Sequence, residues 1–222
     1  MKSSRKKSEI LGNSVFGWAP SVLDGTEHIA QYENQELPSS FSYEGVMPGV
    51  LNQGQTSTCV PHSVSSIMDW YMSLKMGRPT SFNMSIYNIY NRKDNYGDGM
   101  TFKCALSILK NIGAVTAKEY NTNNYNNAVK IREYALVKNL YSLKYSIIMN
   151  GPCLIATMVK SMNDDYWNGS ENYGGHAVSC VGWDTTGIII RNSWGSSWGN
   201  NGYTHMPYKD FGKILEAWTA IF

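Results

Sequence analysis

The stretch GGHAVSCVGWDTTGIIIRNSWG, residues 174–195, decides how the second half of this chain folds. Two runs rich in apolar residues, 177–183 and 188–192, are separated by Asp-Thr-Thr-Gly, which is typical of a β-hairpin. His176 opens the first strand and Asn192 closes the second, so the hairpin would bring both side chains to its open end. There an Asn carbonyl can accept a ring N–H and fix the tautomer and orientation of the imidazole.

A helix is predicted directly after the motif NQGQTSTC, residues 52–59. Over residues 57–76 the apolar side chains recur near the helical period, and Gly77 is a typical C-terminal stop. Ser57 or Thr58 is expected to cap the first turn. Cys59 would then lie at a helix N-terminus, where backbone N–H groups and the helix dipole favour a thiolate and can stabilise an oxyanion. Taken alone, this thiol is equally consistent with a small buried core residue.

The remaining pattern places helices first and strands later. Further helices are expected at 101–111 and near 137–149, and further strands at 153–159 and 203–206. The Asn-rich segment 121–127 is expected to be a loop between two lobes. This order predicts an α+β fold with mostly antiparallel strands.

Composition excludes several classes of function. The chain has 222 residues, 42% hydrophobic and 16% charged, which is typical of a globular protein. A net charge of +2 gives no broad footprint for nucleic acid, and no apolar run predicts a membrane span. The four cysteines show no metal-ligand or disulfide-scaffold spacing. No secretory signal follows the basic N-terminus, so a cytoplasmic or virus-associated location is expected.

Together these motifs resemble the papain-like cysteine peptidases, the family of papain and the cathepsins, over about residues 37–222. Within this family, the chain is most similar to the bacterial or viral members that have a short leader. The motifs that carry the resemblance are Gln53-Gly54-Gln55 with Cys59, Gly151-Pro152, His176-Ala177-Val178, Asn192-Ser193-Trp194-Gly195 and Gly202-Tyr203. The resemblance implies a helical lobe, about 45–127, an antiparallel β-barrel-like lobe, about 128–222, and an active-site cleft between them.

The resemblance also implies the roles of individual residues. The implied catalytic residues are Cys59 as nucleophile, His176 as general base and acid, Asn192 as the residue that orients His176, and Gln53 as oxyanion-hole donor. The implied substrate-binding residues are Gly99, Gly174, Gly175 and Trp194, of which Trp194 also covers the His–Asn hydrogen bond. The implied activity is a cysteine endopeptidase that binds extended polypeptide and forms an acyl-enzyme, with no metal or organic cofactor, nucleic acid or membrane partner.

Some positions depart from the family signature. Thr56 stands where the signature has its first cysteine, so the disulfide usual there is absent, and Ser57 replaces a glycine. The shape of this turn is therefore an open question. His62, one helical turn after Cys59, is expected at the surface or behind the catalytic residues. The small Gly174-Gly175 pair predicts an open or mobile floor in the main side-chain pocket.

Residues 1–36 are predicted to form an N-terminal arm that precedes the peptidase domain. The segment 16–20, Phe-Gly-Trp-Ala-Pro, followed by Asp24, resembles the short leader of bacterial members. Isolated aromatic residues in an otherwise polar arm favour the hypothesis that the arm lies across the cleft as a possible propeptide. The alternative is a flexible tail without function.

Two other functions stay open from sequence. The first is an acyl transferase that uses the same Cys-His-Asn site, although such enzymes more often orient the histidine with Asp than with Asn192. The second is a catalytically silent binding module on the same fold. Retention of Gln53, Cys59, His176 and Asn192 together counts against a silent module, because a dead copy has no physical reason to keep all four.

Overall fold

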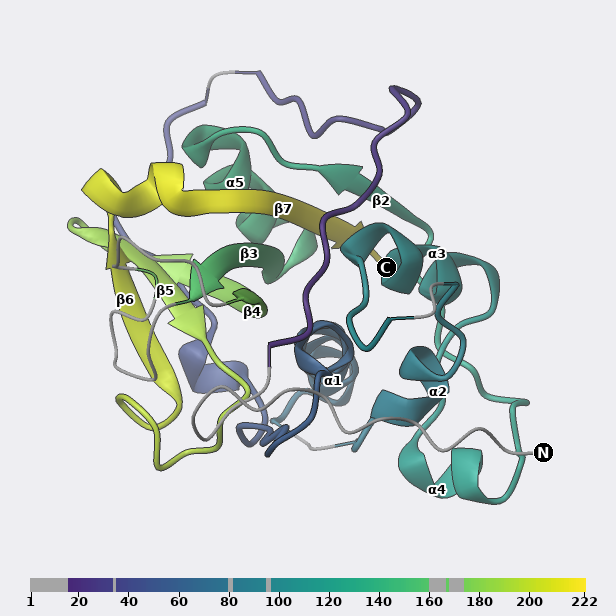
Figure 1. Ribbon diagram of the computed structural model, residues 1–222. Coiled ribbons are helices and arrows are strands. Elements are labelled where there is room, and N and C mark those ends of the chain that lie inside the picture. Colours follow the sequence, from purple (N-terminus) through teal and green to yellow (C-terminus); the bar gives the residue numbers. More distant parts are fainter. Residues whose placement is uncertain (1–15, 34, 80–81, 95–96, 160–166, 168–173) are drawn as a thin grey trace.

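The described chain consists of helices in its first half and mainly strands in its second. The computed structural model describes residues 16–33, 35–79, 82–94, 97–159, 167 and 174–222, so residues 1–15 of the expected arm lie outside the described residues. Most of the helices lie to one side of the sheet, which confirms the predicted α+β class (Figure 1). Within these ranges, no helix combines the length and apolar content that a membrane crossing would require.

The helical lobe is built around α1, Cys59–Met76. It also contains α2, Ile86–Tyr90, α3, Phe102–Asn111, and α4, Ala117–Asn121. The predicted helix over 57–76 is confirmed, and Cys59 is its first residue. Gly77 ends α1 with a φ of 65°, a left-handed conformation that glycine adopts without strain. Thr101 caps α3 by accepting a hydrogen bond from the Cys104 N–H.

The strands form one antiparallel sheet in the order β2-β7-β3-β4-β5-β6, and β1 pairs with β4. Their bounds are β1, Phe41–Ser42, β2, Glu133–Leu136, β3, Cys153–Val159, β4, Gly174–Trp183, β5, Gly187–Arg191, β6, Tyr203–Pro207, and β7, Ile214–Ile221. The predicted hairpin is confirmed as β4 and β5. The Asp184 carboxylate accepts N–H groups of Thr186 and Gly187 and fixes the turn between these strands.

The two faces of this sheet carry different helices. Side chains alternate along β3, so Leu154 and Ala156 belong to the core cluster around α1. Cys153 and Ile155 point to the other cluster, which contains Leu143 and Ile147 of α5, Leu140–Asn150. The sheet is thus buried on both faces, with α1 on the side that carries the nucleophile candidate.

Some elements differ from expectation. The helix expected near 137–149 begins at Leu140, because the Asn139 side chain accepts the Ser142 N–H and caps it there. Strands β2 and β7 were not predicted, since each is defined by pairing with a distant segment. The 3₁₀ helices η1, Glu44–Val46, and η2, Tyr208–Lys213, are also additional.

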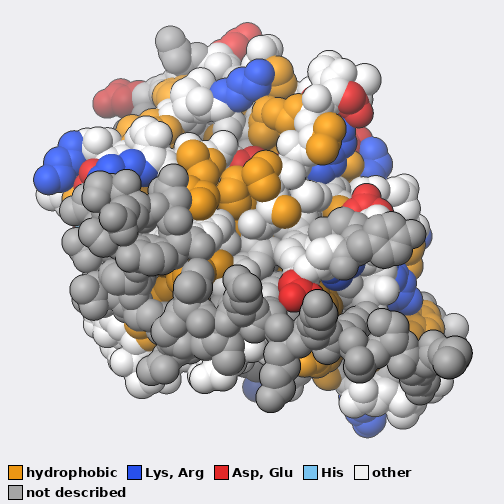
Figure 2. Space-filling view, in the orientation of Figure 1, with side chains coloured by type: hydrophobic (Ala, Val, Ile, Leu, Met, Phe, Trp, Pro, Cys, Tyr) orange, Lys and Arg blue, Asp and Glu red, His pale blue; other side chains and the backbone are white. Residues whose placement is uncertain are grey.

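The described part of the arm runs from β4, where Trp18 pairs with Gly175, to β2. Ala30 N–H donates to the Leu136 carbonyl, and Leu136 N–H donates to the His28 carbonyl. Lys103 of α3 forms ion pairs with Asp24 and Glu27 of the arm. Apolar side chains gather over the arm and β7 on the face shown in Figure 2. Leu23 of the arm and Leu215 of β7 line a hollow of about 300 Å³.

Candidate active site

Cys59 is the first residue of α1, as predicted, and its side chain is fully buried. Burial raises the pKa of the Cys59 thiol to about 11. The backbone N–H groups of Ala177 and Gly17 near the sulfur favour its charged form and oppose this shift. Ala177 follows His176 on β4 and Gly17 belongs to the arm, so both segments pass close to the sulfur. In this arrangement the thiol is neutral at neutral pH.

His176 and Asn192 meet at the open end of the hairpin, as the sequence predicted. His176 Nε2 lies 2.8 Å from Asn192 Oδ1, and both side chains are buried. Oδ1 also accepts the Ser193 N–H at 2.8 Å, so the amide orientation is determined and Nε2 carries the ring proton. Nδ1 is then the basic nitrogen of the neutral ring. Burial lowers the pKa of His176 to about 4, and the bond to Asn192 opposes this shift.

Aromatic rings enclose the imidazole. Trp194 stacks on His176 with ring centroids 4.6 Å apart and an interplanar angle of 21°. Trp198 packs edge-on against Trp194, and Phe16 of the arm packs edge-on against His176 at 6.1 Å. The stacked indole excludes water from the side of the histidine, which strengthens its hydrogen bond to Asn192.

Gln53 is held between the two lobes. Ser193 Oγ donates to Gln53 Oε1 at 2.7 Å, and Gln53 Nε2 donates to the Thr56 carbonyl at 2.9 Å. The main chains are also paired, because Gln53 N–H donates to the Ser193 carbonyl and Asn52 forms an antiparallel bridge with Trp194. Ser193 was not singled out from the sequence, although its place next to Asn192 in the Asn-Ser-Trp-Gly motif was a usable signal.

The turn before Cys59 keeps its shape through hydroxyl groups. Thr56 Oγ1 donates to the Gln53 carbonyl at 2.6 Å and lies 2.5 Å from Thr58 Oγ1. Since the Thr56 proton is already used, Thr58 donates in the second contact. A side-chain cap from Ser57 or Thr58 was expected in the first turn of α1. Thr58 does occupy the N-cap position, but its side chain makes no cap bond, so this expectation is wrong. All four cysteines are free thiols.

The arm lies across the site and is bonded to both lobes. Trp18 N–H donates to the Gly175 carbonyl of β4 at 3.1 Å. On the other side, Met100 N–H donates to the Gly17 carbonyl at 2.8 Å, and Ala19 N–H donates to the Met100 carbonyl at 3.0 Å. Figure 1 shows this segment, in dark purple, running between the sheet and the helices α2 and α3. The arm thus spans the space between the lobes.

The predicted substrate-binding glycines line this crossing. A side chain at Gly174 would collide with Phe16, and one at Gly175 would collide with Trp18. Gly99 also lies against the arm, but the residue whose backbone pairs with it is Met100, one position later. The Gly99 carbonyl instead accepts a hydrogen bond from Lys93. The two small residues before His176 therefore make room for arm side chains.

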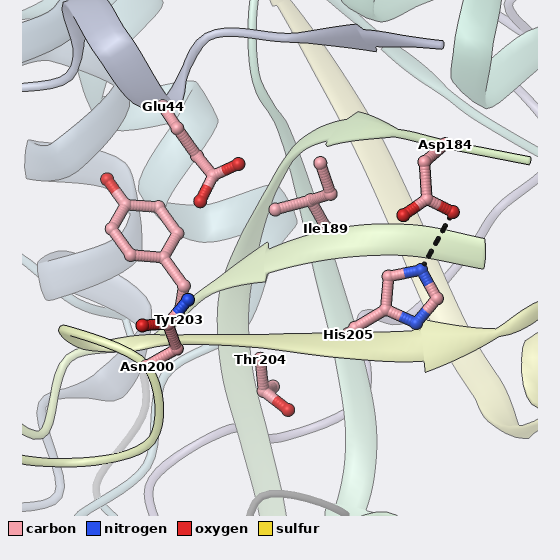
Figure 3. A pocket seen from close by; sticks show the side chains of 7 residues that line it. All are labelled: Glu44, Asp184, Ile189, Asn200, Tyr203, Thr204 and His205. Carbon is pink, nitrogen blue, oxygen red and sulfur yellow. Dashed lines mark hydrogen bonds and ion pairs between the residues drawn. The ribbon is translucent and has the colours of Figure 1, made fainter. Parts of the chain in front are cut away.

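A second hollow, of about 490 Å³, lies on the outer part of the β lobe. Its lining residues are Glu44, Asp184, Ile189, Asn200, Tyr203, Thr204 and His205 (Figure 3). His205 points at Asp184, and the two are 3.1 Å apart. None of the predicted catalytic residues lines this hollow. Over the part of the chain with described coordinates, no three His, Cys, Asp or Glu side chains converge as metal ligands.

Comparison with known proteins agrees with this geometry. The model of the papain family of cysteine proteases matches residues 39–214, well over half of the chain. The chain belongs to the papain family. It is 26% identical to fruit bromelain of Ananas comosus in an alignment that covers 92% of this chain and 69% of bromelain. The chain is also 25% identical to mouse cathepsin K. That alignment covers 82% of this chain but only 63% of cathepsin K, so the chain spans less of this relative than of bromelain.

Solved structures of the papain family share the fold. Xylellain, a cysteine protease from Xylella fastidiosa, superposes with a TM-score of 0.75 at 21% identity, covering 100% of this chain and 98% of that one. The procathepsin B S9 of Trypanosoma congolense also gives 0.75, at 16% identity, covering 93% of this chain and 85% of that one. These values support the two-lobe papain-like architecture.

Proposed function

We propose that this chain is a cysteine endopeptidase. The observation that carries the proposal is the His176–Asn192 hydrogen bond of 2.8 Å, beside a thiol at the first residue of α1. Asn192 fixes the ring so that Nδ1 is the basic nitrogen, and the backbone N–H of Ala177, the residue that follows His176, lies near the sulfur. Membership of the papain family supports the same chemistry.

The proposed reaction passes through an acyl-enzyme. His176 takes the thiol proton, and the Cys59 thiolate attacks the peptide carbonyl carbon. The Cys59 N–H and the Gln53 side-chain amide stabilise the resulting oxyanion. His176 then returns its proton to the leaving amine, and water hydrolyses the thioester with His176 as base. No step requires a metal or an organic cofactor.

The arm is proposed to restrain this reaction as a propeptide. Its backbone is bonded to both lobes at Gly175 and Met100, in the place that an extended substrate would need. The backbone of Gly17 passes close to the sulfur of the proposed nucleophile. Burial under the arm also holds Cys59 and His176 in their neutral forms, which are the less reactive ones. Activity would therefore require displacement or removal of residues 1–36.

The test is peptide hydrolysis by the purified full chain under reducing conditions, with mass spectrometry after treatment with an epoxide thiol reagent. Cys59→Ala should abolish both turnover and labelling. Cys104→Ala removes another buried thiol outside the site and should change neither. Shortening of the chain near Leu37, prevented by Cys59→Ala, would support self-processing. Turnover that survives Cys59→Ala would refute the assignment, and amine adducts that outweigh acid products would favour a transferase.

A further inference from the structure

The peptide bond between Thr58 and Cys59 is held from its carbonyl side by a buried histidine. His62 Nδ1 lies 2.7 Å from the Thr58 carbonyl oxygen, which also accepts the His62 backbone N–H at 3.0 Å. A carbonyl oxygen only accepts hydrogen bonds, so Nδ1 carries the proton. Both residues are buried, with exposed fractions of 8% for His62 and 3% for Thr58. Burial lowers the pKa of His62 to about 4, which keeps the ring neutral in working conditions.

The other end of this peptide unit is the Cys59 N–H. A peptide unit is planar and trans, so its carbonyl oxygen and its N–H point in opposite directions within one plane. Fixing the direction of the Thr58 carbonyl therefore fixes the direction of the Cys59 N–H. A hydrogen bond accepted by the carbonyl also polarises the unit and makes its N–H a stronger donor.

We propose that His62 is a positioning residue of the oxyanion site, because its Nδ1–H holds the Thr58 carbonyl and thereby aims the Cys59 N–H. This assignment rests on the proposed peptidase function. His62 touches neither substrate nor sulfur in the proposed reaction and acts only through the 58–59 peptide unit.

The local structure explains why a side-chain clamp is useful here. Thr58 has φ −111° and ψ 25°, outside the extended conformation usual for an N-cap, and its hydroxyl bonds to Thr56 instead of capping α1. The turn has no disulfide, because position 56 is a threonine. The Thr56–Thr58 hydroxyl contact holds the Thr58 side chain, and His62 Nδ1–H holds the Thr58 carbonyl.

The same helix shows that a shorter side chain can make such a bond. Ser63 Oγ donates to the Cys59 carbonyl, four residues earlier, at 2.9 Å. Ser and Thr commonly form this i to i−4 bond within helices. His62→Thr should therefore restore a donor to the Thr58 carbonyl, whereas His62→Val has the same shape without a donor. The two variants form a matched pair in which only the hydrogen bond differs.

The experiment compares the full chain carrying each substitution with the wild-type chain. Both are first treated in the same way to displace or remove the arm. The readouts are kcat and KM for a peptide substrate, affinity for a peptide aldehyde, which binds as an oxyanion-bearing adduct, and the rate of alkylation by iodoacetamide, which forms no oxyanion. His62→Val should lower kcat and aldehyde affinity by about tenfold, less than the ~10²–10³ typical of a deleted oxyanion donor. KM and the alkylation rate should not change. His62→Thr should stay within about threefold of wild type in every readout.

Equal losses in His62→Val and His62→Thr would overturn the assignment, because the ring and not the hydrogen bond would then matter. A parallel loss of alkylation rate in His62→Val would also overturn it, since His62 would then act on the thiol. Failure of the proposed function would give a different result. The wild-type chain would then be alkylated at Cys59 but would neither cleave peptides nor bind the aldehyde. That result would refute the His62 assignment as well.

Discussion

Gly17 of the arm lies against the backbone of Ser57 so closely that a Cβ atom on Gly17 would stand 2.1 Å from the Ser57 carbonyl oxygen. Backbone atoms cannot yield as the end of a flexible side chain can, so no residue with a side chain fits this position. The carbonyl of the same glycine accepts the Met100 N–H, and its backbone N–H lies near the sulfur of Cys59. At the position where the arm passes Cys59, the structure therefore has no room for a side chain larger than that of glycine.

Gly17→Ala should therefore loosen the arm and raise the basal activity of the unprocessed chain. The added methyl group cannot be accommodated while the Gly17–Met100 bond is kept. We expect initial rates of peptide hydrolysis to rise by about tenfold, the effect of roughly 1.4 kcal/mol of lost contact. Val22→Ala is the matched control, since Val22 is 83% exposed on the same arm. Equal rates for Gly17→Ala and wild type would contradict an inhibitory arm.

The pH dependence of thiol reactivity should change when the arm is removed. With the arm in place, the pKa of Cys59 is raised to about 11 and that of His176 is lowered to about 4, so both groups are neutral between these values. Alkylation of the full chain should then rise steadily with pH toward 11. In a chain without residues 1–36, water reaches the pair, and an ion pair should give a plateau near neutral pH. Alkylation rates measured from pH 4 to 10 test this, and superimposable profiles would refute it.

Gln53→Ala should lower kcat by about 10²- to 10³-fold, because it removes one proposed oxyanion donor. Ser193→Ala should cause a smaller loss, since it deletes the hydroxyl that orients the Gln53 amide and leaves the amide itself. Steady-state kinetics on both variants provide the measurement. Ser107→Ala, a hydroxyl deletion on α3 away from the site, is a suitable control. A Ser193→Ala loss larger than that of Gln53→Ala would argue for a different role of the serine.

Asn192→Ala should lower kcat/KM by about 10- to 100-fold, the equivalent of roughly 1.5–3 kcal/mol for a buried hydrogen bond to a group that becomes charged. The substitution removes the acceptor that holds His176 Nε2 at 2.8 Å. Asn200→Ala replaces an exposed asparagine of the same lobe and should have no effect. A kinetic comparison of both variants is the test. Undiminished kcat/KM in Asn192→Ala would show that Trp194 alone orients the ring.

Asp69→Asn should stabilise the chain increasingly as pH rises. Burial raises the pKa of Asp69 from 3.8 to about 7, so the folded state disfavours its ionised form. The contribution that the protonated Asp69 carboxyl makes to the free energy of unfolding is fully present below about pH 4. It is therefore lost as pH rises toward 7. Asparagine keeps an acceptor for the Met84 N–H without the charge. The difference in Tm between variant and wild type should grow from pH 4 to 7 and then level off, whereas a constant difference would mean that the carboxyl does not titrate in this range.

Local patterns in the sequence were sufficient for the elements that carry the chemistry. The spacing of apolar residues predicted the helix that begins at Cys59, and the turn residues Asp184 to Gly187 predicted the hairpin that joins His176 to Asn192. These features depend on interactions within a few residues, namely helix periodicity, strand alternation and turn chemistry. The meeting of His176 with Asn192 follows from the hairpin alone.

Contacts between distant segments required the tertiary structure. Strand β7 forms only because β2 and β3 flank it, and the Ser193–Gln53 bond joins residues 140 positions apart. His62 could not be distinguished from a surface histidine by sequence, because its role depends on which carbonyl its ring meets after packing. Local sequence patterns were enough to identify the groups that could react and the elements on which they lie. Tertiary packing decided what covers them, how strongly water is excluded and which way their hydrogen bonds point, since these depend on neighbours that the chain brings together only on folding.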